Sequence, residues 1–494
     1  MITRNVAVRY CGSVLLANLL CGQAVWGQEQ TEKPNAAQAA EARRETLVEP
    51  KKPLRGPKYL NLRYDEDFSY LDGPEGSYQP DYFDRFKNIH IAEDWRLTLG
   101  GEFRFQMQSE TNKGFGATEP ANDTFTLYRY FVHGDFKFRD LFRVFVQGAV
   151  VHDEDRDLAP RGIDENIGDL TQLFFDLRVL GEEVPLTLRV GRQELQYGAQ
   201  RFVSPLEWAS IRRRFDAVKL FWKSKNWNID AFYAKIVAVQ RRQADRFNED
   251  FDFYGLYTTY KGIPRHILDF YLFAIDNTGN PTNPNGKAGD VTRFTLGSRF
   301  AGKTAGFDYE TELAGQWGRW AGDTIQAWSW SAVGGYTLDT PAKPRIGVGF
   351  DWATGDDDPT DGTVGTFDQM FPLGHAYLGF LDLVGRQNII AANVNLSAWM
   401  IPNKVKGAMA YHAFWLADPE DSLFNAGARP GRRDPAGGSG REVGQELDLT
   451  VAWKLDVHSK LLFGYSHFWE GNFIINTGPS EDADLFYVQY QFKF

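Results

Sequence analysis

LFYVQYQFKF, residues 485–494, is the stretch that decides the fold. Apolar or aromatic side chains occupy every second position from Phe486 to Phe494, while Tyr487, Gln489, Gln491 and Lys493 fill the positions between them. Successive side chains of a β-strand point to opposite faces of the sheet. One face of this strand is therefore apolar and the other polar, which is typical of a strand that separates lipid from a water-filled lumen.

The same alternation begins at Trp95 and continues through most of the chain. Residues 95–107 and 126–138 show it clearly, with large apolar side chains on one face and charged ones on the other. Such segments run about 10–14 residues, as tilted membrane strands do, whereas strands of soluble sandwiches have about 5–6. Their number predicts an all-β fold, a transmembrane antiparallel β-barrel of about 18 strands (16–18).

A barrel in hydrocarbon has to close, because each unpaired backbone group at a strand edge is costly there. We therefore expect the strand at residues 485–494 to pair with the one that begins at Trp95. The aromatic end of this strand, Tyr490, Phe492 and Phe494, also has the form of the signal that outer-membrane assembly machinery recognises.

The chain before the barrel divides into three segments. Residues 1–27 combine basic residues, an apolar run and a small residue at Gly27, which predicts a cleaved signal peptide. Residues 28–58 are rich in Ala, Glu, Lys and Pro, which is typical of a disordered periplasmic linker. Residues 59–94 carry aromatic and acidic side chains with turn signals, and we expect them to plug or cap one end of the barrel, residues 95–494.

Composition and motifs exclude several classes of function. The formal net charge of −11 disfavours nucleic acid as a partner. The sequence has neither a Gly-x-Ser-x-Gly elbow nor a His-Glu-x-x-His metal motif. Ser466 and His467 are neighbours in a strand and point to opposite faces, so they cannot act on one another. We therefore expect no enzymatic activity.

The polar face of the alternating strands should line the pore. The candidate pore-lining residues are Arg96, Arg104, Arg129, Arg143, Arg178, Arg189, Arg192, Lys219, Arg293 and Arg299. Acidic residues share these faces, so the lining is mixed in charge, although a local ring of arginines can still set anion selectivity. Arg192 belongs to this set only if a bulge at Gly191 turns it inward. For residues 212–214, three arginines without alternation, a loop folding toward the pore and a strand end both remain open.

An acidic run at residues 356–362 is the one candidate for a cofactor site. Asp356, Asp358 and Asp361 offer the hard oxygen ligands that Ca²⁺ prefers. The EF-hand pattern fails, because Asp361 stands at its sixth position where glycine is needed and Phe367 at its twelfth where glutamate is needed. An acidic extracellular turn is the alternative interpretation, and no other cofactor is expected.

Several stretches of the chain match a known family. They include residues 61–71 (NLRYDEDFSYL), 188–195 (LRVGRQEL) and 444–447 (GQEL). Over nearly the whole chain after Tyr59, the sequence resembles the alginate export family of outer-membrane proteins. The resemblance implies a monomeric barrel of about 18 strands in the bacterial outer membrane.

The resemblance also implies a function. An acidic exopolysaccharide or oligosaccharide would cross the outer membrane through the barrel by passive diffusion. The implied partners are outer-membrane lipid, the assembly machinery, an anionic polysaccharide and periplasmic secretion components. A general porin for small solutes is the main alternative, and a surface receptor or adhesin is a third.

Overall fold

The computed structural model describes residues 56–74, 76–181 and 184–494. The predicted signal peptide, residues 1–27, and nearly all of the predicted linker, residues 28–58, lie outside the described residues. No helix within the described ranges is long and apolar enough to cross a membrane.

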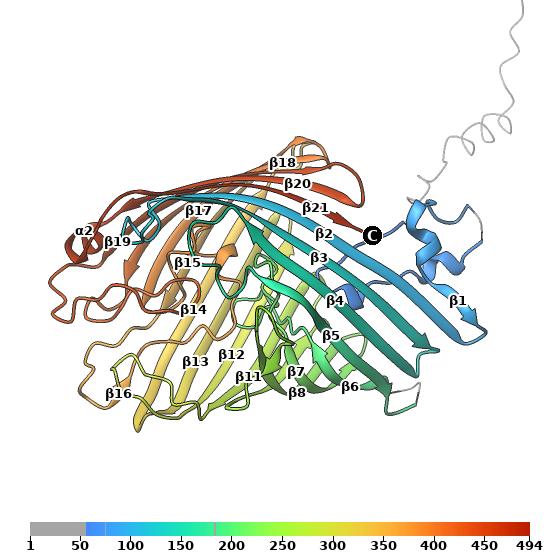
Figure 1. The fold of residues 1–494 in the computed structure, drawn as a ribbon, viewed down its shortest axis with the longest axis horizontal. Coiled ribbons are helices and arrows are strands. Elements are labelled where there is room, and N and C mark those ends of the chain that lie inside the picture. The colour runs from blue at the N-terminus through green and yellow to red at the C-terminus, as the bar shows by residue number, and fades with distance from the viewer. Residues whose placement is uncertain (1–55, 75, 182–183) are drawn as a thin grey trace, which may run out of the picture. The chain divides into compact units, whose positions relative to one another are not determined.

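Eighteen antiparallel strands form one closed barrel (Figure 1). In chain order they are β2 (Trp95–Thr111), β3 (Asp123–Phe138), β4 (Phe142–Glu154), β5 (Asn166–Arg178), β6 (Leu186–Gln193), β7 (Phe215–Lys223), β8 (Trp227–Ala238), β10 (Phe251–Tyr260), β11 (His266–Asn277), β12 (Val291–Thr304), β13 (Phe307–Trp320), β14 (Asp323–Thr337), β15 (Arg345–Ala353), β17 (Ile389–Ile401), β18 (Val405–Leu416), β19 (Glu442–Lys454), β20 (Ser459–Glu470) and β21 (Ala483–Lys493). Each strand pairs with the next in this order, and β21 pairs with β2 to close the ring. The predicted fold and the closing pair of strands are confirmed.

The remaining elements are short. The same sheet holds β1 (Ile89–Ala92), β9 (Arg246–Phe247) and β16 (Thr363–Val364). Before the barrel lie the 3₁₀ turns η1 (Arg63–Asp65), η2 (Ser69–Asp72) and η3 (Tyr82–Phe86), and within its loops lie η4 (Gly374–Ala376) and the helix α2 (Asn472–Thr477).

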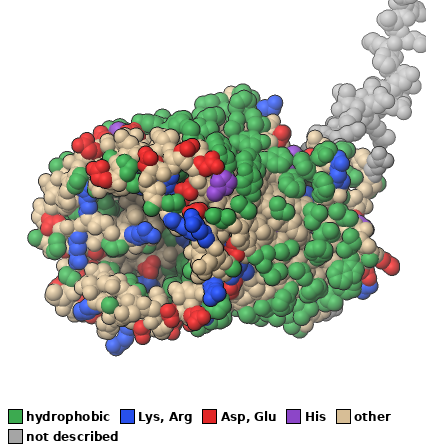
Figure 2. Space-filling model, viewed as in Figure 1, with side chains coloured by type: hydrophobic (Ala, Val, Ile, Leu, Met, Phe, Trp, Pro, Cys, Tyr) green, Lys and Arg blue, Asp and Glu red, His purple; other side chains and the backbone are tan. Residues whose placement is uncertain are grey.

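The alternation in the sequence sorts side chains between the two faces of the wall. On β21, Phe486 is 42% exposed while its neighbour Tyr487 is 1% exposed. On β3, Val132 is exposed and Phe131 is buried. Figure 2 shows a broad hydrophobic surface over β2, β3 and β4. This outer surface faces membrane lipid.

The two ends of the barrel differ in the length of their connections. One end has short turns, such as residues 139–141, 305–306 and 402–404, and the other has long loops, such as residues 354–388 and 417–441. Outer-membrane barrels place short turns in the periplasm and long loops outside. The long-loop end is hollowed and carries charged side chains of both signs (Figure 2).

Two long loops fold into the barrel and meet there. The first inner loop, residues 194–214, joins β6 to β7, and the second inner loop, residues 354–388, joins β15 to β17. They form a β-bridge between Val203 and Phe371. The amide of Ser204 donates to the carbonyl of Phe371 at 2.9 Å, and the amide of Phe371 donates to the carbonyl of Phe202 at 3.0 Å.

A hydrophobic core fastens this crossing to the barrel wall. The ring of Phe371 lies 5.0 Å from that of Phe253 on β10 and 5.2 Å from that of Phe215 on β7. Both wall residues point inward and are fully buried. Part of the barrel interior is therefore packed with protein, and the inner loops narrow the lumen.

Candidate functional site

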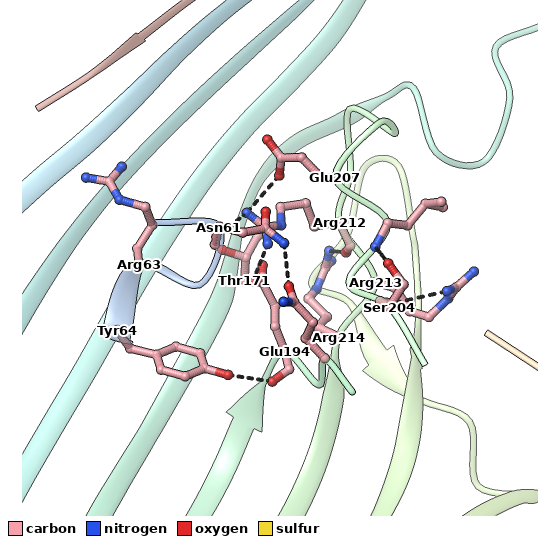
Figure 3. Close-up of polar contacts among 12 residues, drawn as sticks. Asn61, Arg63, Tyr64, Thr171, Glu194, Ser204, Glu207, Arg212, Arg213 and Arg214 are labelled. Carbon is pink, nitrogen blue, oxygen red and sulfur yellow. Dashed lines mark hydrogen bonds and ion pairs between the residues drawn. The ribbon is translucent and has the colours of Figure 1, made fainter. Parts of the chain in front are cut away.

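A chain of ion pairs holds the first inner loop against the wall. Arg129 on β3 donates to Glu102 on β2 at 2.8 Å and to Glu207 of the loop at 2.8 Å. Arg212 of the loop lies 2.9 Å from Glu207 and 2.9 Å from Glu194 (Figure 3). Opposite charges alternate along this chain, and each guanidinium bridges two carboxylates. Charge-assisted hydrogen bonds are stronger than neutral ones, so this network fixes the position of the loop against the wall.

Glu194, the last carboxylate in this series of ion pairs, lies just after β6 and is 2% exposed. Burial raises the pKa of its carboxyl from 4.5 to about 7, and the nearby Arg212 offsets part of that rise. The carboxyl of Glu194 therefore loses its proton in the neutral range of pH, and its ion pair with Arg212 depends on pH there.

Arg104 adds a second fastening from the wall. Its guanidinium donates to the carbonyl of Glu207 at 2.8 Å and to the hydroxyl of Ser210 at 3.2 Å. Arg104 and Arg129 are both almost completely buried. Two of the candidate pore-lining arginines thus hold the inner loop in place and are not exposed to the lumen.

Arg213 differs from the arginines on either side of it. Figure 3 shows Arg212 directed toward Glu194 and Arg213 directed toward Ser204. The Arg213 guanidinium donates to the carbonyls of Ser204 at 3.0 Å and Pro372 at 3.4 Å. Within the described part of the chain, no carboxylate forms an ion pair with it. Burial lowers its pKa to about 10, so it remains charged at neutral pH.

Most of the other candidate arginines and the lysine are paired with carboxylates. The pairs are Arg143 with Asp135, Arg189 with Asp176, Lys219 with Asp230, Arg293 with Asp368 and Arg299 with Asp269 and Glu310. Arg96 and Arg178 lie at the short-turn end, where Arg96 donates to the carbonyl of Glu93 and Arg178 lies 3.8 Å from Asp140. The charges of these residues are largely compensated within the wall.

Arg192 does not take the inward position expected for it. The pairing of β6 with β5 and β7 runs through Gly191 and Arg192 without a bulge. Arg192 therefore shares a face with its cross-strand partner Leu173, which is 45% exposed on the outer surface. Its guanidinium pairs with Asp216 of β7 at 2.8 Å. The expectation of a bulge was wrong because the φ of +128° at Gly191 is accommodated within the regular ladder.

The three aspartates of the acidic run, the candidate calcium ligands, make hydrogen bonds within their own turn. Asp356 accepts the amides of Asp358 and Gly365, Asp358 accepts the amide of Thr360, and Asp361 accepts the amide of Thr363. These carboxylates therefore stabilise their own turn. No group of three or more His, Cys, Asp or Glu in the described ranges is arranged to hold a metal ion.

The segment before the barrel reaches the same site. Tyr64 donates its hydroxyl to the carbonyl of Glu194 at 2.8 Å, and its carbonyl accepts from Arg143 at 2.5 Å. Its ring packs against Phe145 and Phe174 on the inner wall. Residues 61–64 thus enter the short-turn end of the lumen. Residues 59–94 were expected to form a plug or cap, but the irregular segment gave no indication of which residues would enter.

Sequence reasoning also missed Glu194, Glu207 and Arg201 of the first inner loop. Arg201 pairs with Glu312 on β13 at 3.0 Å. Glu194 lies in residues 188–195, a stretch that carries the family resemblance, but nothing in that stretch marks it as part of the site. Arg201 and Glu207 are isolated charged residues in a stretch without period two, a pattern shared by ordinary surface loops.

Comparisons with known proteins agree with this architecture. The crystal structure of OccAB2 from Acinetobacter baumannii superposes with a TM-score of 0.57 at 10% identity, over 80% of this chain and 98% of that one. OccK8 (OprE) from Pseudomonas aeruginosa gives 0.53 at 13%, over 81% and 98%. The outer membrane protein OprD from Pseudomonas aeruginosa gives 0.52 at 11%, over 81% and 93%. At these identities the likeness is one of fold. No curated protein sequence matches the chain.

A closed 18-strand barrel with a lipid-facing surface and a charged, narrowed lumen defines a transport channel of the bacterial outer membrane, and no enzymatic family is indicated. The chain belongs to the alginate export family, whose model matches residues 95–488.

Proposed function

We propose that this channel conducts an acidic exopolysaccharide or oligosaccharide across the outer membrane by passive diffusion. Family membership supports the substrate class. The observation that carries the proposal is Arg213, a guanidinium without a carboxylate partner in the described residues, at the point where the two inner loops cross. A fixed, uncompensated positive charge at a constriction attracts anions and repels cations.

The paired arginines do not compete with this role. Arg129, Arg189 and Arg212 satisfy carboxylates of the protein itself, so they contribute little net field to a passing polymer. Arg213 is held by two neutral carbonyls and keeps its full charge for an anionic ligand. Uronate groups along a polymer would contact it one after another, and diffusion would need no energy source in this chain.

The test is ion selectivity of the purified full-length protein in planar bilayers. A reversal potential under a KCl gradient should show anion preference, and a polyuronate added on one side should reduce the current. Arg213→Gln should lower the anion-to-cation permeability ratio roughly twofold or more. Arg139→Gln is the matched control, because Arg139 is paired with Asp94 in an exposed turn. Cation preference in the wild type, without block by polyuronate, would refute the proposal.

A general porin for small solutes is the second candidate. The close balance of paired charges in the lumen favours it, because such a lining discriminates weakly between ions. Liposome swelling separates the two candidates. A general porin admits neutral and acidic oligosaccharides of equal size at equal rates, whereas the proposed exporter admits the acidic one faster.

We further propose that the protein works as a single chain, since its own strands close the barrel. Tyr490, Phe492 and Phe494 would be the residues that the assembly machinery contacts before closure. Periplasmic secretion components would approach the short-turn end.

A further inference from the structure

The junction of β2 and β21, here called the seam, is uneven at the short-turn end. Their pairing stops at Glu102 and Lys493, while β2 continues back to Trp95. Gly101 and Phe494 add two more backbone hydrogen bonds, from the amide of Gly101 to the main-chain oxygen of Phe494 at 2.9 Å and from the amide of Phe494 to the carbonyl of Gly101 at 3.0 Å. Residues 95–100 of β2 therefore extend past the end of β21. An edge of this kind exposes unpaired backbone groups.

Residues 59–92 cover that edge. β1 pairs with the start of β2, from Ile89 opposite Leu97 to Ala92 opposite Trp95. The ammonium group of Lys87 donates to the carbonyl of Leu99 at 2.5 Å. Two positions further along β2, Arg63 donates to the carbonyl of Gly101 at 2.8 Å.

The same residues also hold the end of β21. Arg63 donates through its other terminal nitrogen to the main-chain oxygen of Phe494 at 2.8 Å. The ring of Phe83 lies 5.3 Å from that of Phe494 and 5.7 Å from that of Phe492. One guanidinium thus joins the first and last strands of the barrel directly.

A third contact ties the segment to the neighbouring turn. Asp81 lies 2.8 Å from Nε2 of His458, between β19 and β20, and Nδ1 of His458 lies 2.8 Å from the carbonyl of Lys493. Asp81 also accepts the amide of Phe83 at 2.8 Å, which begins η3 and fixes its aromatic residues over the seam.

Gly101 shows how closely the parts fit. A Cβ added there would lie 2.6 Å from the ring of Phe494 and 2.8 Å from the carbonyl oxygen of Phe131 on β3, so glycine leaves the space in which the ring of Phe494 packs against β2. Arg63 is 3% exposed and Lys87 is 3% exposed. Burial lowers the pKa of Lys87 to about 7, which is consistent with an interface that excludes water.

We propose that the short-turn end of the seam is a binding site for residues 59–92 of the same chain, which act as a clasp between β2 and β21. The seam joins the first and the last barrel strands in chain order, so its pairing is the one that completes the ring. The clasp replaces the missing backbone partners of β2 and keeps β21 from separating sideways. This role is independent of what the channel conducts.

Amide hydrogen exchange of the full-length protein in detergent tests the proposal. Arg63→Gln should raise the exchange of residues 97–101 and 488–494 by about tenfold or more, with little change in β12 and β13 on the far side. Phe83→Ala removes only a ring contact and should raise exchange at the same two strands to a smaller degree. Arg139→Gln, which breaks an exposed pair at the same end, should change neither.

The outcomes are distinguishable. Unchanged exchange at the seam in both Arg63→Gln and Phe83→Ala would overturn the proposal. A uniform rise across all strands would also overturn it, because the segment would then support general stability and not the seam. Gel migration of unheated samples confirms that each variant forms a barrel before its exchange is measured.

Discussion

Arg212 in the first inner loop donates a hydrogen bond to the carbonyl of Asn61 at 2.9 Å. The same guanidinium contacts Glu194 and Glu207. One side chain therefore joins the segment before the barrel to the loop that narrows the lumen. We therefore expect a displacement of the segment before the barrel to displace the first inner loop as well.

Replacing Arg212 tests this connection. Arg212→Gln leaves the buried carboxylate of Glu194 without its cation, which typically costs about 3–5 kcal/mol, while Glu207 keeps its ion pair with Arg129. We expect a lower thermal midpoint and larger current fluctuations in bilayers as the loop loosens. Arg213→Gln is the matched control, since it removes an adjacent arginine that has no carboxylate partner in the described residues. Equal thermal midpoints for the two variants would contradict this account.

The carboxyl of Glu194 should make the loop sensitive to pH. Its pKa in the folded protein is raised from 4.5 to about 7, so the native state binds this proton more tightly than the unfolded chain. The stabilisation is complete below about pH 4.5 and is lost as pH rises through about 7. The free energy of unfolding in detergent should therefore fall between pH 5 and pH 8. Glu194→Gln should remove this pH dependence. A pH dependence that persists in this variant would show that another titratable group causes it.

The aromatic core under the loop crossing should be essential for stability. Phe253→Ala creates a cavity beside Phe371 and should cost about 3–5 kcal/mol. Phe270→Ala is the control, because Phe270 is 51% exposed on the outer surface. Denaturant unfolding in detergent compares the two. Similar losses in the free energy of unfolding for both variants would show that the interior core contributes no more to stability than the outer surface does.

Calcium should have no effect on stability. The carboxylates of Asp356, Asp358 and Asp361 accept backbone amides of their own turn. Thermal unfolding with millimolar CaCl₂ and with EDTA should give the same midpoint. A thermal midpoint that rises with calcium in the wild type but not in Asp358→Asn would show that this turn binds calcium and would contradict the prediction.

The barrel was predictable because a membrane strand obeys one simple rule. Lipid on one side and water on the other impose a period of two, and Phe486 and Tyr487 follow it at the end of the chain as residues near Trp95 do at its start. The count of strands and their closure follow from the same rule. Arg104, Arg129 and Arg189 were placed on the inward face for this reason.

The interior of the barrel was less predictable. Phe253 and Phe215 obey the alternation yet pack against Phe371, whose position depends on contacts far apart in the sequence. Whether an inward arginine faces water or a carboxylate also depends on the partner strand, as for Arg189 and Asp176. The prediction for Arg192 was wrong because Gly191 was interpreted as a β-bulge, whereas the pairing of β5 and β6 is continuous there.

The crossing of the inner loops has a consequence for the kind of molecule that passes. Val203 and Phe371 are joined through their backbones, and the phenylalanines beneath them are packed as in a soluble core. Such an aperture cannot widen by side-chain rotation alone. We therefore expect sieving by cross-section and not by mass, so that a long unbranched chain enters end-on where a short, heavily substituted one is refused.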